Sequence, residues 1–342
     1  SAGMTYALIG MRTISGVYHH GILPVVAFAI GWLIAEGSSD KQIRDGILAL
    51  AAGFGTYATL NMLVNIGNNR YRLIDFWTGT YRAATGSGAL NTLPISVTPY
   101  AVKFEKRLPV KIMFLALFFV TIQYMFMLGT RTQFAILLLI VILAALQFAY
   151  SEQGIAGVLK CIGIMAVISL IAFLLYHFNI LSIRDYILST NLAARYERRA
   201  SLENSDSFRF QSFWIGLREL IQYPMGGRAS QIYRHNMWLD VGRVSGIIPF
   251  CLLLIYSIKN FANVTVIWRS KQILPSLRYL LLFLYIGAYV NCFVEPIWEG
   301  ALNFFLALCV VDGMVSAMMR RLENDPNPEE SVPDTSNLHT DL

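Results

Sequence analysis

Long apolar stretches separated by short polar connectors make up most of the chain. Several of these stretches are close to the roughly 20 residues that a helix needs to cross the hydrocarbon core of a bilayer. The pattern predicts an all-α fold, a polytopic transmembrane bundle of about nine helices. The predicted spans are 21–35, 46–64, 86–102, 110–128, 133–150, 155–178, 237–258, 277–294 and 301–319.

The third of these segments, 86–102, is interrupted by polar residues and two prolines. The polar residues are Asn91, Thr92, Ser96 and Thr98. We include the segment because nine spans place all the connectors that are rich in Lys and Arg on one face. Lys and Arg are enriched in cytoplasmic connectors, so the N-terminus is predicted outside and the C-terminus inside. The basic connectors follow spans one, three, seven and nine.

The chain is predicted to form a single transmembrane domain, 1–319, followed by a cytoplasmic tail, 320–342. The tail is acidic, contains prolines and has no periodicity, which is typical of a disordered segment. The N-terminus does not resemble a secretory signal, which has a basic beginning, a short apolar core and a cleavage site with small residues. The sequence opens as if in mid-protein, which is typical of a chain whose first spans are missing.

Composition supports the membrane prediction. Apolar residues make up 56% of the chain and charged residues only 14%, against roughly 25% charged in soluble proteins, and the mean hydropathy is +0.53. These values exclude a cytosolic enzyme, a disordered chain and a small disulfide scaffold. The four cysteines lie inside apolar stretches without metal-ligand spacing, so we interpret them as packed side chains.

Arginine and lysine are divided between the two predicted faces. All seven lysines lie at or near the predicted cytoplasmic side, whereas the long outer connector 180–236 contains arginines but no lysine. Arginine grips phosphate with a planar fork and stays charged when partly dehydrated. The alternative is that these arginines contact lipid headgroups and balance nearby carboxylates, but such contacts do not exclude lysine. The loop arginines are Arg184, Arg195, Arg198, Arg199, Arg209, Arg218, Arg228 and Arg234.

Within this loop, one segment has helical spacing. Its apolar residues are Phe210, Phe213, Trp214, Leu217 and Ile221. Residues 204–207 supply capping side chains, and Pro224 with the two following glycines ends the run. We predict an amphipathic helix that lies in the membrane interface, with Arg209 in its first turn.

Three cationic or ionisable groups are predicted at outward-facing helix N-termini. Arg209 begins the amphipathic helix, Arg131 begins the span at 133–150, and His235-Asn236 begins the span at 237–258. Free backbone N–H groups and the helix dipole favour anions at such positions. We therefore predict a diphosphate pocket at the outer membrane surface.

Two further groups near this pocket can carry protons. His235 can act as a general base near neutral pH, or it can simply cap its helix. Glu295, at the outer end of the eighth span, is a second base or an acceptor for sugar hydroxyls; the alternative is an interfacial carboxylate.

These motifs together resemble the O-antigen ligase and O-antigen polymerase family. The resemblance rests on Ser-Phe-Arg209-Phe-Gln-Ser-Phe-Trp214, on Tyr-Pro224-Met-Gly226-Gly, and on His235-Asn236-Met-Trp-Leu239 with the spaced glycines that follow. Gly129-Thr-Arg131-Thr is similar to a small-residue–arginine step of the family, with Thr130 where serine is common. The resemblance covers roughly Asp75 to Gly300.

The resemblance implies a metal-independent, inverting glycosyltransferase on the outer face of the bacterial inner membrane. Its donor would be a polyprenyl-diphosphate-linked oligosaccharide, and its acceptor a hydroxyl of a glycan or glycolipid. Arg131 and Arg209 would hold the diphosphate, and His235 would orient or deprotonate the acceptor. The other substrate-binding residues expected in this pocket are Arg195, Arg198, Arg199, Arg228, Asn236 and Glu295.

No metal, cofactor or nucleic acid is expected, because the chain has neither a phosphate-cradling GxxxxGK[ST] motif nor outward acidic pairs with metal-ligand spacing. Polymerase and ligase differ only in the acceptor and are not separated. A secondary transporter or flippase of an anionic solute remains the alternative; it predicts polar residues at mid-membrane and paired broken helices. A structural membrane anchor would leave the lysine-free loop unexplained.

Overall fold

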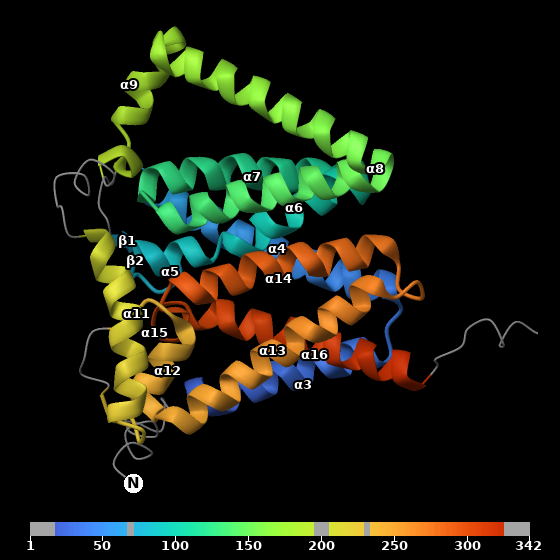
Figure 1. Ribbon diagram of the computed structural model, residues 1–342, viewed down its shortest axis with the longest axis vertical. Coiled ribbons are helices and arrows are strands. Elements are labelled where there is room, and N and C mark those ends of the chain that lie inside the picture. Colours follow the sequence, from blue (N-terminus) through green and yellow to red (C-terminus); the bar gives the residue numbers. More distant parts are fainter. Residues whose placement is uncertain (1–17, 67–71, 195–204, 229–232, 325–342) are drawn as a thin grey trace, which may run out of the picture.

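Long apolar helices form the body of the protein (Figure 1), and in the part of the chain that the structure describes six of them are long and apolar enough to cross a membrane. The computed structural model describes residues 18–66, 72–194, 205–228 and 233–324. The six helices are α4 (Asp40–Leu63), α7 (Leu108–Leu128), α8 (Arg131–His177), α13 (Ile247–Arg269), α14 (Pro275–Val294) and α16 (Leu302–Asn324). The structure is thus mainly helical, and its long apolar helices are compatible with the predicted all-α, multi-pass membrane protein.

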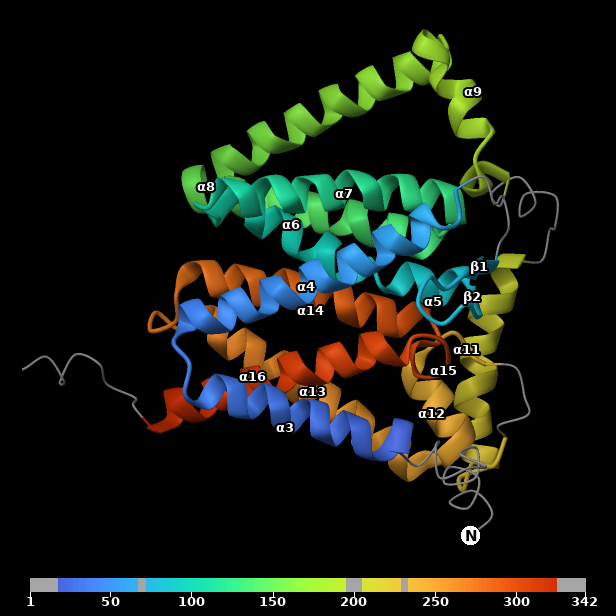
Figure 2. The ribbon, with the colours of Figure 1, turned by 180° about the vertical axis from the view of Figure 1, so that it is seen from behind.

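Helix α8 contains two of the predicted spans. Gly154 adopts φ 59° and ψ −144° within it and divides it into two arms. Glycine is suited to this left-handed conformation because it has no Cβ. Figures 1 and 2 show that the arms meet at this turn and diverge toward the other end of the bundle. The second arm, 155–177, is exposed on nearly every side, as expected of a helix surrounded by lipid.

The predicted third span is a broken helix in the interior. It consists of α5 (Ala84–Ala89) and α6 (Thr92–Phe104), separated at Leu90 and Asn91. Residues 86–98 are all buried. Irregular backbone at membrane depth is tolerated where protein surrounds it, and this explains how the polar residues of the segment are accommodated.

The predicted seventh span is divided into two helices. Gly246, with φ +96°, separates α12 (Met237–Ser245) from α13. The membrane helix therefore begins ten residues later than the apolar pattern suggested and continues to Arg269, so Lys259 lies inside it. The short helix α12 carries the buried charges of Asp240 and Arg243.

The connectors gather at two ends of the bundle (Figures 1 and 2). At the lysine end, which we define by the turns α3–α4, α6–α7 and α13–α14 and by Gly154, α3 (Leu23–Glu36) meets α4 and most of the lysines are found. The opposite end, the loop end, contains the hairpin of β1 (Arg72–Ile74) and β2 (Tyr81–Ala83) together with four helices. These are α9 (Ile183–Leu188), α11 (Ser205–Gln222), α12 and α15 (Ile297–Gly300).

Helix α11 corresponds to the predicted amphipathic segment and lies across the loop end, transverse to the bundle (Figure 1). Its protein-facing side contains Ser212, Glu219 and Leu220, which are all buried. Its aromatic side faces outward: Phe210 and Trp214 are 67% and 54% exposed. This orientation is the one expected for a helix whose apolar face contacts lipid.

Candidate functional site

His235 lies in a strained segment just before α12. Its φ is +55°, a left-handed conformation that few residues other than glycine adopt, although His, Asn and Asp do so more often than most. Asn236 caps α12 by accepting a hydrogen bond from the Leu239 N–H at 3.0 Å, and its amide donates to the Phe293 carbonyl at the end of α14. The ring of Tyr233 meets the His235 ring edge to face, with 4.8 Å between the centroids.

Glu295 connects His235 to the beginning of α8. Its side chain is buried at the C-terminal end of α14, and the Thr132 hydroxyl donates a hydrogen bond to Oε1. His235 Nδ1 lies 4.0 Å from Oε2 of the same carboxylate. A single carboxylate therefore contacts the N-terminal turn of α8 and lies beside the imidazole.

The N-terminus of α8 is formed by a sharp turn. Gly129, with φ 67°, ends α7, and Thr130 precedes the first residue of α8, Arg131. The first backbone N–H groups of a helix have no partner within it, and they create a favourable field for an anion. The predicted start at Gly-Thr-Arg-Thr is therefore confirmed as a helix start at the loop end (Figure 1).

A cavity of about 420 Å³ opens beside His235. Its apolar wall consists of Phe210 and Phe213 of α11 with the end of α14. Its polar wall is the segment Arg234-His235-Asn236. Such a cavity matches an amphiphilic ligand, with hydrocarbon against the aromatic wall and a polar group against the imidazole.

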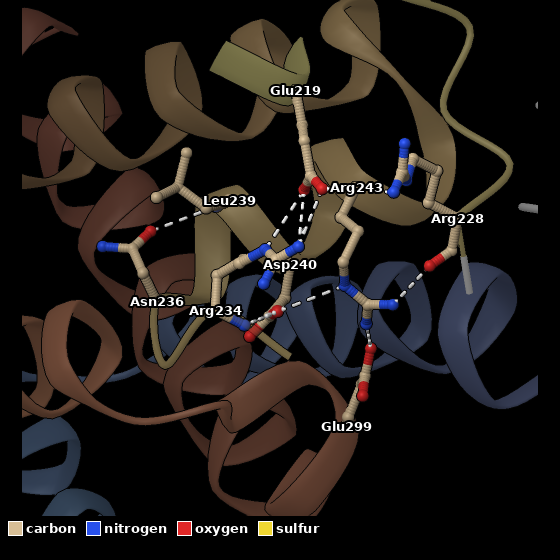
Figure 3. Close-up of polar contacts among 8 residues, drawn as sticks. All are labelled: Glu219, Arg228, Arg234, Asn236, Leu239, Asp240, Arg243 and Glu299. Carbon is tan, nitrogen blue, oxygen red and sulfur yellow. Dashed lines mark hydrogen bonds and ion pairs between the residues drawn. The ribbon is translucent and has the colours of Figure 1, made fainter. Parts of the chain in front are cut away.

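Six charged side chains form a network beside this cavity (Figure 3): Glu219, Arg228, Arg234, Asp240, Arg243 and Glu299. Arg234 makes a forked pair with Glu219 of α11, with N···O distances of 2.8–3.1 Å. Arg228 approaches the same carboxylate at 3.4 Å and covers the Tyr223 ring. The network joins α11, α12 and α15 into one unit that holds His235 in place.

The other half of the network centres on Arg243. Its guanidinium donates to Glu299 of α15 and to the Arg228 carbonyl, the latter at 2.7 Å. Its Nε lies 3.6 Å from Asp240, whose carboxylate also accepts the Arg234 N–H at 2.6 Å. Burial raises the pKa of Asp240 to about 6 against the opposing effect of the Arg234 N–H, and burial also raises the pKa of Glu299.

The raised pKa gives Asp240→Asn a pH-dependent effect on stability. The asparagine oxygen can still accept the Arg234 N–H. Below pH 4, Asp240 is protonated both in the folded protein and in the unfolded chain. Between about pH 4 and pH 6, only the folded protein retains the proton, so the wild type loses stability relative to the variant as the pH rises; above pH 6 both states have lost the proton and the difference becomes constant. We expect the variant to gain up to about 3 kcal/mol between pH 4 and pH 7.

Thermal unfolding in detergent at pH 4, 5, 6 and 7 measures this difference. The matched control is Asp185→Asn on α9, where the side chain is 62% exposed and lies outside the buried charge network. A constant difference between wild type and Asp240→Asn across this range would contradict the prediction.

The predicted site residues are found in different settings. His235, Asn236 and Glu295 lie together, and Arg131 begins the helix whose next residue contacts Glu295. Arg228 is paired with Glu219. Arg209 lies in α11, one residue before the cavity-lining Phe210, and its side chain lies outside the described part. Residues Arg195, Arg198 and Arg199 also lie outside it, and their roles stay predictions.

Sequence reasoning missed the polar contacts beneath this site. Thr132 holds Glu295, and Gln133 donates to Asn291, whose amide donates to Thr92 at the α5–α6 break. All of these side chains are buried. The sequence did contain an indication of these contacts: amides and hydroxyls stand inside apolar spans, where burying them costs free energy unless they are hydrogen-bonded to one another.

The chain matches no protein-family model and no curated protein. The resemblance to the O-antigen ligase and polymerase family therefore rests on the motifs alone.

Proposed function

We propose that the protein is a membrane glycosyltransferase of the O-antigen ligase or polymerase type, acting at the loop end of the bundle. The observation that carries the proposal is the group formed by His235, Glu295 and the N-terminus of α8 beside an amphiphilic cavity. This group offers a base, a carboxylate and an anion-binding helix terminus within one site. A lipid-linked diphosphate sugar is a substrate whose chemistry uses all three.

The donor would be a glycan linked to a polyprenyl diphosphate. Its diphosphate would meet the N–H groups of α8 and the guanidinium of Arg131, which stabilise the charge that develops as the bond from the anomeric carbon to the phosphate oxygen breaks. Arg209 would contribute a second guanidinium group that donates two hydrogen bonds to the diphosphate. The lipid chain would follow the aromatic wall of the cavity, at Phe210 and Phe213.

The acceptor would be a hydroxyl on a glycan or glycolipid. Its oxygen attacks the anomeric carbon from the face opposite the diphosphate, which leaves with the bonding electron pair. The hydroxyl proton passes to His235, and the imidazolium that forms is stabilised by Glu295. The net reaction transfers the glycan with inversion and releases the polyprenyl diphosphate.

Reconstitution tests this activity directly. Purified protein in liposomes should convert a polyprenyl-diphosphate oligosaccharide and an acceptor glycolipid into a longer glycan, and it should release polyprenyl diphosphate in equal amount. Mass spectrometry of the lipid extract measures both products. Release of diphosphate without glycan transfer, or no conversion with any acceptor offered, would contradict the proposal.

The runner-up function is a secondary transporter or flippase, and one observation favours it. The α5–α6 break lies inside the bundle with buried amides and hydroxyls around it, as in transporters whose broken helices line the substrate site. Proteoliposomes separate the two functions. A transporter moves the lipid-linked sugar across the bilayer without changing its mass, whereas a transferase changes the mass without requiring movement.

The expected setting follows from the same proposal. The loop end would face outward from a bacterial inner membrane, where lipid-linked glycans are assembled into surface polysaccharide. The protein would meet its donor, its acceptor and membrane lipid there.

A further inference from the structure

A second cavity lies at the loop end, with a volume of about 620 Å³. It is bounded by α4, by the turn of the β1–β2 hairpin and by the start of α16, and it shares no lining residue with the His235 cavity. Figure 2 shows α4 leading toward the hairpin, with α15 and the start of α16 below them. We call this cavity the α4 groove.

The α4 groove exists because one side of α4 is small. Ala49 and Gly53 lie about one turn apart on this side, next to the larger side chains of Leu50 and Phe54. A Cβ built on Gly53 meets no atom within 4 Å. Buried Leu90, at the α5–α6 break, also lines the groove. The deep part of the groove is therefore lined by hydrocarbon on a helix that is long and apolar enough to cross the bilayer.

The outer part of the groove is aromatic and rigid. Asp75 accepts hydrogen bonds from the N–H groups of Trp77 and Thr78, at 3.0 and 2.9 Å, and from the Tyr57 hydroxyl. Asn61 accepts the Phe76 N–H at 2.9 Å. These contacts hold Trp77 at the mouth of the groove with 80% of its surface exposed, an arrangement that suits a ligand in contact with both water and lipid.

The lining indicates which molecule fits. Its polar side chains, those of Thr78 and Asn303 with the Tyr57 hydroxyl, accompany the aromatic residues of the hairpin turn, and among the described residues none that lines the groove is charged. The His235 cavity, in contrast, includes the imidazole, which can carry a positive charge. A phosphate would therefore be stabilised in the His235 cavity and not in the α4 groove. The complementary ligand of the groove has a hydrocarbon chain in the membrane and an uncharged polar group at the surface.

We propose that the α4 groove binds a glycolipid, with its hydrocarbon chain along Ala49 and Gly53 and its uncharged saccharide against Phe76, Trp77 and Asn303. Sugar rings present apolar C–H faces to aromatic side chains and hydroxyls to amides, and both kinds of group are found at the mouth. The glycolipid is the acceptor of the transfer; this assignment rests on the proposed function, whereas the binding site does not.

Photolabelling tests the groove without requiring turnover. The probe is an alkyl glucoside that carries a diazirine in its chain, added to the full chain in phosphatidylcholine nanodiscs, with labelled peptides mapped by mass spectrometry. Labels are expected in the segment 49–57 of the wild type. Gly53→Leu fills the groove and should lower this labelling about tenfold, because several methylene contacts are lost.

Gly163→Leu is the matched control, since a Cβ at Gly163 also meets nothing within 4 Å and the residue lies on the lipid-facing arm of α8. Labelling of 49–57 should be unchanged in this variant. Unlabelled alkyl glucoside should compete with the probe, and an alkyl phosphate of the same chain length should compete much less.

Equal labelling of wild type and Gly53→Leu, or equal competition by the alkyl phosphate, would overturn the glycolipid site. Failure of the proposed function has a different signature. In that case, the labelling and its competition persist while reconstituted wild type forms no transferred glycan, and the groove then remains a glycolipid site without an acceptor role.

Discussion

His235→Ala is expected to lower glycan transfer by about 10²–10⁴-fold, the usual contribution of a positioned general base. The variant removes the imidazole beside Glu295, so the acceptor hydroxyl keeps its proton at the moment of attack. Initial rates in proteoliposomes with saturating donor and acceptor measure the effect. Donor affinity should change little, because the proposed diphosphate contacts are at the N-terminus of α8 and not at His235.

His177→Ala is the matched control, because His177 ends α8 with an exposed side chain far along the chain from the site. It should transfer glycan at the wild-type rate. Glu295→Gln tests the positioning role: the amide keeps an acceptor for Thr132 but loses the charge that stabilises the imidazolium, so the pH–rate profile should shift. Wild-type turnover in His235→Ala with intact folding would exclude the base and leave His235 as part of the helix start.

Arg131→Lys is expected to lower the rate of transfer by about 10²–10³-fold, the range found when one donor to a developing anion is removed. Lysine keeps the charge but loses the fork that grips two phosphate oxygens. The effect should fall mainly on kcat, because the diphosphate gains charge as it leaves. Arg209→Lys should act in the same direction if its side chain reaches the same diphosphate.

The matched control for both variants is Arg184→Lys on α9, where the arginine side chain is 46% exposed beside Asp185. Its transfer rate should equal that of the wild type. Full turnover in Arg131→Lys would contradict a forked diphosphate contact, and an increase confined to KM would assign Arg131 to ground-state binding.

Apolar length predicted the helices because a bilayer imposes one dominant requirement on a spanning segment. It could not predict how those helices are broken. The α5–α6 break depends on burial against neighbours far away in the sequence, and the division at Gly246 depends on contacts between Gly246 and the turn at Pro224. Hydropathy averaged along the chain contains neither kind of information.

The site shows the same division between local and long-range information. Local motifs indicated His235-Asn236 and the start of α8, because a helix start has its own residue preferences. The contact between Thr132 and Glu295 joins residues 163 positions apart, and only the tertiary structure could reveal it. The pairing of Arg228 and Arg234 with Glu219 also shows that a count of loop arginines overestimates how many are available to a ligand.

The second arm of α8 has a consequence for how this protein can vary. The arm is attached at its two ends: at Gly154, and through Tyr186 and Asn191, which hydrogen-bond to Gln123 and to the Met127 carbonyl of α7. Between these attachments its side chains meet almost no protein. Selection on this stretch therefore acts on solubility in hydrocarbon and hardly at all on shape. Among related chains, residues of this arm should be replaced readily by other apolar residues. The helices of the bundle should instead keep the side chains that fit their neighbours.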